Sequence, residues 1–593
     1  MLPIGRVGVA MPAGSVFTRA ALAASPSRAV KTWTPYDRPA QYGVVVEKDV
    51  RIPMRDGVVL VADVYRPDAP GRFPVLVTQT PYNKNGSLGA GNRYFVERGY
   101  VHVVVDVRGT GGSGGVWESF GEAEQRDGYE IVEWAARQPW SSGKVGLWGA
   151  SYMAINQFFT AAQQPPHLRA LFPIVPMADS YRDIVMTGGQ VNTAFIPMWL
   201  GLVTGAGLVP PSDTAADPVR ASGVLMGHLG GALAFEGRTL AATTLGGDEA
   251  YDGPFHRLRS PIEVIDRVRV PAFIVGGLHD IFQRGEPLLY EALRRRGVTA
   301  KLLIGPWTHG DFGSGLPADG VPALDQIALR WFDHYLKGMN TRVDAIPDVT
   351  QYMLGRERYE VQPDWPHPRL TVQRLYLRAA GALTPQRPVP DEPADRMLQH
   401  PLNGACSAST NQWLIGALGS TPCARDNRLT ELGEITYTTA PMTREMVING
   451  PIAAHLWVQT TAREAVVSVR VTEVAPDGTS TELTAGLLAA SFRAVDRSRS
   501  RIIGGAVLQP WHPFTRASVE PVTPGEPMLL QVEIFPTSAV IRPGHRLRIA
   551  VGPSDFPHAA SPVPQLLGQA GGIVTILHDA AHPSHVVLPV VPR

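Results

Sequence analysis

Hydrophobic residues follow two different rhythms along the chain, and the rhythm changes near residue 345. Before that point, short β-branched runs alternate with longer amphipathic stretches, a pattern typical of strands alternating with helices. Strands are predicted over 44–50, 58–65, 74–80, 100–107, 144–149, 168–175, 270–277 and 300–305, and helices over 122–138, 152–164, 286–296 and 321–337. Because this alternation builds a parallel sheet covered on both faces, we expect an α/β core.

The alternation is interrupted over residues 180–260, which are rich in Gly, Ala, Leu and Met and carry few charges. We interpret this stretch as a helical cap inserted into the core. Its charge-free part, residues 184–212, is interrupted by Pro197 and Gly201. It is marginal for a membrane span, which needs roughly 20 predominantly apolar residues. We therefore expect a covered apolar segment and no stable membrane insertion.

Beyond residue 345 the hydrophobic runs are short and are separated by turns rich in Gly and Pro. Strands are predicted over 447–460, 465–474, 483–492, 528–536, 546–551 and 573–578, with no long helix among them. Regular short strands favour a β-sandwich of jelly-roll type. The predicted organisation is a disordered extension or weak signal segment (1–40), a core in two parts (41–179 and 261–345), the cap (180–260) and the jelly-roll domain (346–593).

The composition is that of a folded protein with balanced charge. Hydrophobic residues make up 44% of the 593 residues and charged residues 18%, which is enough apolar material for large cores. The 54 Lys and Arg residues against 53 Asp and Glu give a net charge of +1, so no global basic field attracts nucleic acid. We expect a cytoplasmic protein. The Ala-Leu-Ala tripeptide at residues 21–23 resembles a cleavage site and keeps a secreted or cell-envelope location open.

The chain has two cysteines, Cys406 and Cys423, close enough in sequence for a local disulfide. Two ordinary thiols fit this spacing equally well, because the sequence does not state the compartment. No Cys/His cluster has the spacing of zinc ligands, so we expect no metal site.

Ser151 lies where a predicted strand passes directly into a predicted helix. Gly149 precedes it by two positions, as a nucleophile elbow requires, because the sharp turn leaves no room for a side chain there. The position two after the serine is usually glycine and is Met153 here, which departs from the pattern. Ala154, one residue further, is small enough for a close approach of helix and strand. We predict that Ser151 is a nucleophile; a helix-capping serine is the alternative.

A serine nucleophile needs a general base, and the base needs an orienting carboxylate. Asp280 and His309 follow the ends of two consecutive predicted strands, the edge at which open α/β sheets bind ligands. Their order after Ser151 is the order that this architecture uses. We therefore predict a triad of Ser151, Asp280 and His309. His279 is the rival base, but it shares a loop with the acid.

Acyl transfer also needs hydrogen-bond donors for the developing oxyanion. The backbone N–H of Tyr152, directly after the nucleophile, is the expected first donor. The loop after an earlier strand carries Tyr82, whose hydroxyl is a candidate second donor; an ordinary packed tyrosine is the alternative.

These motifs together resemble the cocaine-esterase-like and X-Pro dipeptidyl-peptidase family of α/β-hydrolases, which also contains α-amino acid ester hydrolases. The matching pieces run in order over about residues 44–593 and are Pro81-Tyr82, Asp106–Gly109 with Gly112–Gly114, Gly149–Tyr152, Gly276 to Asp280, Gly305–His309, Pro543–His545 and Ser554–Pro557. The resemblance implies an α/β-hydrolase core with a cap, a jelly-roll domain and no cofactor. It also implies that Tyr82 and Tyr152 form the oxyanion hole.

The predicted function is hydrolysis of small carboxylic esters or amides through an acyl-enzyme on Ser151, with a homo-oligomer left open. X-Pro dipeptidyl-peptidase and α-amino acid ester hydrolase or acylase activities are alternatives. A more distant one is a carbohydrate-binding protein, in which Trp365, Trp413 and Trp511 would stack on sugars. A further candidate is dinucleotide binding by residues 109–114, which match G-x-G-x-x-G without an evident following helix. Candidate pocket residues are Phe195, Trp199 and Trp307.

Overall fold

The computed structural model describes residues 31–89 and 91–592. Its first sheet has ten strands in the order β1-β2-β4-β3-β5-β6-β9-β10-β11-β12. The strands are β1 (Val44–Pro53), β2 (Val59–Pro67), β3 (Phe73–Thr80), β4 (Val101–Asp106), β5 (Ser141–Ala150), β6 (Leu168–Ile174), β9 (Ala272–His279), β10 (Ala300–Thr308), β11 (Val349–Met353) and β12 (Arg358–Gln362). The neighbours from β4 to β11 pair in parallel, and β1, β2 and β12 pair antiparallel at the two edges.

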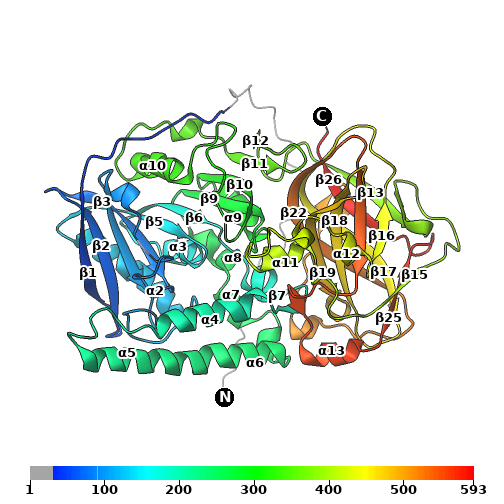
Figure 1. Cartoon of the computed structure of the whole chain (residues 1–593), viewed down its shortest axis with the longest axis horizontal. Helices are drawn as coiled ribbons and strands as arrows, with labels where there is room; N and C mark the ends of the chain where they lie inside the picture. Colours follow the sequence, from blue (N-terminus) through cyan, green and yellow to red (C-terminus); the bar gives the residue numbers. More distant parts are fainter. Residues whose placement is uncertain (1–30, 90, 593) are drawn as a thin grey trace, which may run out of the picture.

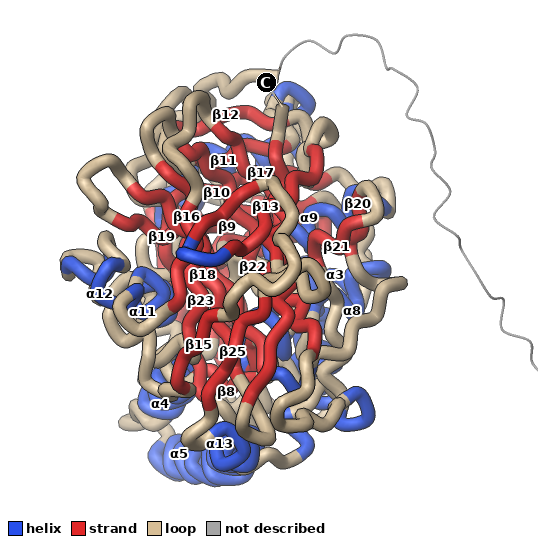
Figure 2. The backbone as a smooth tube through the Cα atoms, turned by 90° about the vertical axis from the view of Figure 1, so that its right-hand side faces the viewer, coloured by secondary structure: helices blue, strands red, loops and turns tan. Residues whose placement is uncertain are grey.

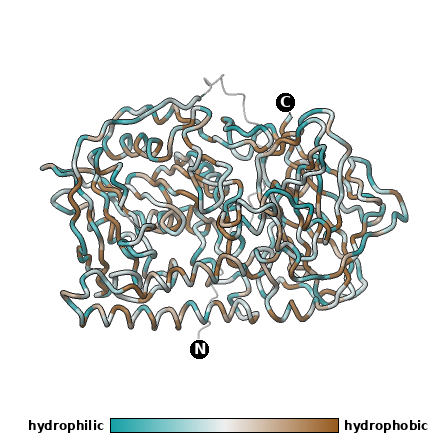
Figure 3. The backbone as a smooth tube through the Cα atoms, in the orientation of Figure 1, coloured by the Kyte–Doolittle hydropathy of each residue, from teal (hydrophilic) through white to brown (hydrophobic). Residues whose placement is uncertain are grey.

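Helices cover both faces of this sheet, as the α/β pattern predicts. Successive residues of β3 enter different cores: Val75 and Val77 pack with one cluster, and Leu76 packs with another. The first cluster is covered by α2 (Glu122–Arg137), α3 (Tyr152–Ala162) and α9 (Gly285–Arg295), and the second by α1 (Arg93–Val96) and α10 (Leu324–Tyr335). Hydrophobic positions follow the strands, and hydrophilic ones are frequent in the surface loops (Figure 3).

The segment between β6 and β9 is mostly helical. It contains the π-helical turn η1 (Ser180–Val185), α4 (Phe195–Gly207), α5 (Pro218–Gly231), α6 (Arg238–Thr244), α7 (Pro254–Leu258) and α8 (Pro261–Val264). Helices α4, α5 and α6 run along the lower side of the molecule in Figure 1. Two short strands, β7 (Met186–Thr187) and β8 (Gln190–Asn192), form a three-stranded sheet with β24 (Ala559–Ala560) of the C-terminal part, in which β8 lies in the middle. Within the described part of the chain, no helix has the length and apolar character that a membrane span requires.

The C-terminal part forms a second sheet of eleven strands around a separate core (Figure 2). Its strands are β13 (Thr371–Arg378), β14 (Ala382–Thr384), β15 (Asp395–Leu398), β16 (Ile435–Thr438), β17 (Met446–Thr460), β18 (Val466–Val474), β19 (Ser480–Ala489), β22 (Met528–Ile541), β23 (Arg546–Gly552), β25 (Ile573–Leu577) and β26 (His585–Val590). A small hairpin, β20 (Arg501–Ile503) and β21 (Ala506–Gln509), stands apart from it. The molecule is thus an α/β core followed by a C-terminal β domain.

Two predicted boundaries need correction. The first sheet continues past residue 345, because β11 extends its parallel part and β12 closes its edge. The predicted extension, residues 1–40, is anchored from residue 31 onward: Lys31 Nζ lies 3.0 Å from Asp348, and Arg38 pairs with the buried Asp333. Residues 1–30, which include the predicted cleavage tripeptide, lie outside the described residues.

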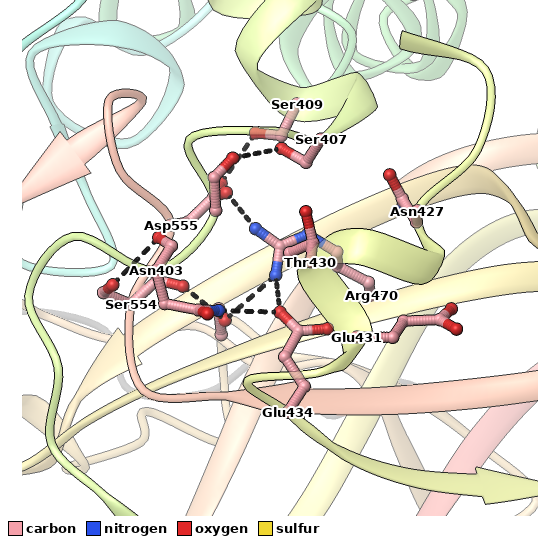
Figure 4. Close-up of polar contacts among 12 residues, drawn as sticks. Asn403, Ser407, Ser409, Asn427, Thr430, Glu431, Glu434, Arg470, Ser554 and Asp555 are labelled. Atoms are coloured by element: carbon pink, nitrogen blue, oxygen red, sulfur yellow. Dashed lines mark hydrogen bonds and ion pairs between the residues drawn. The ribbon is translucent and has the colours of Figure 1, made fainter. Parts of the chain in front are cut away.

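A buried ionic cluster fixes the interior of the β domain. Arg470 is fully buried and forms ion pairs with Glu434 and Asp555, with Glu482 3.4 Å from its Nε (Figure 4). Burial raises the pKa of Glu434 and of Glu482 to about 7. Burial opposes ionisation of Asp555 as well, yet Arg470 and His558 hold its pKa well below the usual range. The single cation therefore stabilises a set of carboxylates that would otherwise be costly to bury.

Replacement of Arg470 by Met should lower the free energy of unfolding by roughly 3–5 kcal/mol, because it leaves buried carboxylates without a counterion. The loss should be larger at about pH 8 than at about pH 5. Without Arg470 the folded-state carboxyl pKa values rise, so stability is lost as pH rises through them. Urea denaturation at both pH values measures this. Arg358→Met is the matched control, since that side chain is 59% exposed in its pair with Glu360 and should cost at most about 0.5 kcal/mol. Equal losses in the two variants would contradict the role of the cluster.

Candidate active site

Ser151 occupies a strained turn between β5 and α3. Its φ and ψ are 57° and −123°, a left-handed backbone conformation that non-glycine residues rarely adopt. Gly149, at φ 151°, makes the turn possible: a Cβ there would lie 2.6 Å from the Cβ of Met153. Met153 stands where this motif usually has its second glycine, and its side chain fills the space that a side chain at position 149 would need. Ala154 is buried one residue further along.

The three predicted triad residues meet at the carboxyl edge of the parallel strands. His309 Nε2 lies 2.8 Å from Ser151 Oγ, and His309 Nδ1 lies 2.8 Å from Asp280 Oδ2. Asp280 directly follows β9 and His309 directly follows β10, which pair in parallel. The imidazole of His309 thus lies between the hydroxyl and the carboxylate, the geometry that general-base activation of a serine requires. The rival base His279 is the last residue of β9, and no hydrogen bond joins it to Ser151 among the described contacts.

The loop that carries Asp280 is held by several backbone contacts. The carboxylate is fully buried, and its Oδ1 accepts the N–H of Phe282 at 2.7 Å. Glu286, in the first turn of α9, accepts the N–H of Gly277 at 3.0 Å. Burial, and then the negative charge of Asp280, raise the pKa of Glu286 well above its usual range. The shift favours the neutral form of Glu286 over a second negative charge close to Asp280.

Tyr82 and Tyr152 both lie beside Ser151. Trp199 Nε1 donates to the Tyr82 hydroxyl at 3.1 Å, and the same hydroxyl contacts Ser151. Burial raises the pKa of Tyr82, so the phenol keeps its proton and remains a donor. Tyr152 is the first residue of α3, and its backbone N–H consequently has no partner within the helix.

The side chain of Tyr152 anchors this helix start in a polar network that the sequence did not reveal. Its hydroxyl donates to Glu124 at 2.7 Å and accepts the Trp117 indole N–H at 2.9 Å. The ring stacks on Phe120 with centroids 4.0 Å apart. Burial raises the pKa of Glu124 to about 7. These contacts fix the position of the Tyr152 backbone, on which the first oxyanion donor depends.

An apolar cavity of about 760 Å³, its open mouth included, leads to Ser151. Phe195 and Trp199 of α4 line it together with Tyr82. Its other lining residues are mostly hydrophobic and come from α3, α4, α6, α7, the π-helical turns η1 and η2 (Ala232–Gly237) and the neighbouring loops: Phe120, Ile155, Met177, Ile184, Val185, Ile196, Leu200, Phe235, Leu240, Phe255 and Phe282. The prediction that Trp307 lines the pocket is wrong. Trp307 is 1% exposed and bonds the Ser314 carbonyl in the core on the other face of the sheet.

Among the described residues that line the cavity, Arg259 is the only one that carries a full charge. The two tyrosines, Tyr82 and Tyr152, are the other ionisable side chains there. Arg259 donates to the carbonyls of Phe255 and Glu118 and lies over the Phe255 ring at 3.9 Å. Three nearby carboxylates do not line the cavity and are occupied by ion pairs. Asp179 and Asp252 bind Arg182, and Asp183 binds Arg284.

The other candidate motifs have structural explanations. In the glycine-rich loop, Gly112 donates its N–H to the buried Asp106, and a Cβ at Gly111 would overlap the same carboxylate. The loop therefore wraps a side chain of the protein. Trp365 and Trp413 are buried, and Trp511 lies between Arg182 and Arg499, each 3.8 Å from its ring. These contacts leave no open aromatic platform for a sugar at those three positions.

Two family models match most of the chain. Residues 56–311 match the X-Pro dipeptidyl-peptidase (S15 family) model, and residues 341–587 match the X-Pro dipeptidyl-peptidase C-terminal non-catalytic domain. Cocaine esterase from Rhodococcus sp. (strain MB1 Bresler) is 27% identical over 92% of this chain and 99% of its own length. An α-amino acid ester hydrolase structure aligns with TM-score 0.73 at 22% identity, over 96% of this chain and 100% of that one. An aminopeptidase structure from a marine sediment Thaumarchaeota archaeon aligns with TM-score 0.73 at 21% identity, covering 96% and 99% of the two chains.

Replacement of Gly149 by Ala should disturb the turn at Ser151. The new Cβ would press on Met153, and we expect a loss of more than about 1 kcal/mol of stability. Displacement of the serine should lower kcat by up to about 10²-fold. Gly201→Ala in α4 is the control, because its Cβ would meet nothing within 4 Å and alanine favours a helix. Thermal denaturation and ester turnover compare the two variants; an unimpaired Gly149→Ala would show that the close approach is not needed.

Proposed function

The chain belongs to the X-Pro dipeptidyl-peptidase and cocaine-esterase family of serine hydrolases, and we propose that it cleaves carboxylic esters with a hydrophobic acyl group. The family assignment makes it an enzyme that hydrolyses esters or amides.

His309 takes the proton from Ser151 as Oγ attacks the substrate carbonyl, and Asp280 holds the imidazole in the required tautomer and stabilises the imidazolium. Tyr82 and the Tyr152 N–H donate to the tetrahedral oxyanion. His309 then protonates the leaving alcohol, and water releases the acyl group by the same route. The observation that carries this proposal is the hydrogen-bonded series Ser151–His309–Asp280 at the cavity.

The cavity favours esters over the two alternative activities. An X-Pro dipeptidyl-peptidase or an α-amino acid ester hydrolase must accommodate a free α-ammonium group near the nucleophile. No Asp or Glu lines the described cavity, and Asp179, Asp183 and Asp252 are already paired with arginines. The cation of Arg259 would repel an ammonium group. The hydrophobic lining supports instead an uncharged alkyl or aromatic acyl group.

The helical segment 180–260 acts as a cap in this proposal. Its helices α4 and α6 supply Phe195, Trp199 and Leu240 to the cavity, so its position sets the space available to the acyl group. The eleven-stranded C-terminal part is proposed to be a jelly-roll sandwich, and the core to end with β12 at Gln362.

A disulfide joins Cys406 and Cys423. Such bonds persist in oxidising compartments and are rare in the cytosol. The disulfide therefore favours the secreted or cell-envelope alternative over the cytoplasmic location that the sequence predicts.

Removal of the triad should abolish turnover. Ser151→Ala or His309→Gln should lower kcat by roughly 10⁴–10⁶-fold. Tyr82→Phe removes one oxyanion donor while keeping the ring, and should lower kcat by about 10²–10³-fold. Phe95→Tyr, which adds a hydroxyl in the core on the other face of the sheet, shows whether a comparable change away from the site has the same effect. Near-normal turnover by Ser151→Ala would refute the proposed mechanism.

The acyl preference is measured with nitrophenyl esters of increasing acyl chain length and a Gly-Pro anilide. We expect Ser151-dependent ester turnover with an optimum at an apolar acyl group, and little or no cleavage of the anilide. Efficient Ser151-dependent cleavage of the anilide would move the assignment to a dipeptidyl-peptidase.

A further inference from the structure

We propose that the disulfide-closed segment from Cys406 to Cys423, which belongs to the β domain, is a positioning element for the catalytic triad and acts through Gln412. The inference rests on the proposed roles of Asp280 and His309. Figure 1 shows helix α11 (Ala408–Trp413), the helical part of this segment, between the core and the C-terminal sheet. We call residues 406–423 the clamp loop.

The clamp loop contacts the backbone of the catalytic acid directly. Gln412 is buried, and its Nε2 donates to the carbonyl oxygen of Asp280 at 2.8 Å and to Gln283 Oε1 at 3.1 Å. Gln283 in turn donates to the carbonyl of Pro536 in β22 at 2.8 Å. One side chain of the β domain therefore holds the loop whose carboxylate orients His309.

The same clamp loop also packs on the loop of the catalytic base. A Cβ at Gly310, directly after His309, would overlap the carbonyl oxygen of Ile415. A Cβ at Gly416 would overlap the Thr308 hydroxyl, directly before His309. Both flanking positions of the base thus touch consecutive residues of the clamp loop.

The backbone conformation of Ile415 indicates that the clamp loop is held in place by its surroundings. Its φ is 52°, a left-handed conformation that is unfavourable for a β-branched residue. Such a conformation persists only where the surrounding structure determines it. Here it presents the Ile415 carbonyl to Gly310.

Two hydrogen bonds hold the clamp loop to the rest of the β domain, and the disulfide closes its two ends. The Thr430 hydroxyl donates to the carbonyl of Cys406. Within α11, Ser409 donates to Asp555 at 2.7 Å, the carboxylate that pairs with Arg470 (Figure 4).

A third contact fixes the end of α11 that carries Gln412. Trp413 is buried and stacks on His558 at 3.7 Å, and His558 bonds Asp555 at 2.8 Å. The Arg470 cluster thus reaches the acid loop through Asp555, α11 and Gln412. Opening the disulfide removes one constraint on this connection, so the redox state of the cysteines should affect turnover.

The test compares Gln412→Met with Gln399→Met in the full-length protein. Gln399 is an equally buried glutamine of the β domain, and its amide bonds the backbone of Val466 and not a triad loop. We expect Gln412→Met to lower kcat by about 10- to 10²-fold with KM for a short ester unchanged, as misplaced catalytic groups do. The acid limb of kcat/KM should move to lower pH, because a displaced Asp280 stabilises the His309 imidazolium less well. Gln399→Met should change neither kcat nor the pH profile.

Reduction of the disulfide provides a second measurement, which uses the wild-type protein and so does not depend on whether a variant folds. Because the chain has only two cysteines, a phosphine reductant acts on this disulfide alone. We expect reduction to lower kcat of the wild type, reoxidation to restore it, and Cys406→Ser/Cys423→Ser to be insensitive to reductant.

The inference is overturned if Gln412→Met keeps the wild-type kcat and pH profile, if Gln399→Met loses kcat equally, or if reduction has no effect. Ser151→Ala, measured alongside, distinguishes failure of the positioning role from failure of the proposed function. Residual turnover in that variant would refute the proposed function, whereas an unaffected Gln412→Met in an enzyme that needs Ser151 refutes only the positioning role.

Discussion

The parallel pairing of β5, β6, β9 and β10 is the constraint on which the rest of the molecule depends. It brings the carboxyl ends of these strands to one edge of the sheet, so that Ser151, Asp280 and His309, far apart in sequence, come within hydrogen-bond distance. Each of the three sits just past its strand, and side chains at such positions are not committed to either core. A shift of β10 against β9 by one residue would turn His309 away from Ser151, because successive side chains point to opposite faces.

The charges buried between the core and the β domain make the two parts one unit. Arg284 of the core binds Asp183 at 2.9 Å and Glu533 of β22 at 2.8 Å, and it is nearly inaccessible to solvent. Removing either partner would strand a buried charge, which is far more costly than loss of a surface ion pair. Such contacts explain how a segment remote from the nucleophile in sequence holds a fixed position relative to it.

The sequence predicts the elements that local chemistry determines. The alternation of strands and helices, the turn at Ser151 and the strand ends at Asp280 and His309 all follow from period, glycine placement and chain order. The roles assigned to these residues and to Tyr82 stay predictions, although the structure brings them together. Trp307 was wrongly predicted to line the pocket, because strand β10 turns its ring into the core on the other face. Glu124, which binds Tyr152, and Gln412, which binds Asp280, were not found, since both contacts join distant segments and no local pattern marks them.

The β domain matches a family model described as non-catalytic, and the contacts of α11 give that description a physical meaning. None of the predicted triad or oxyanion residues comes from this domain. Its contribution is to restrict where Asp280 and His309 can lie. Gln412 donates a hydrogen bond to the carbonyl of Asp280. Ile415 and Gly416 pack closely on Gly310 and Thr308, the two neighbours of His309. Preorganised geometry is valuable in catalysis because displacements of about 1 Å are already costly. A domain without reactive groups can therefore be needed for turnover, since its contacts limit the positions open to the loops after β9 and β10.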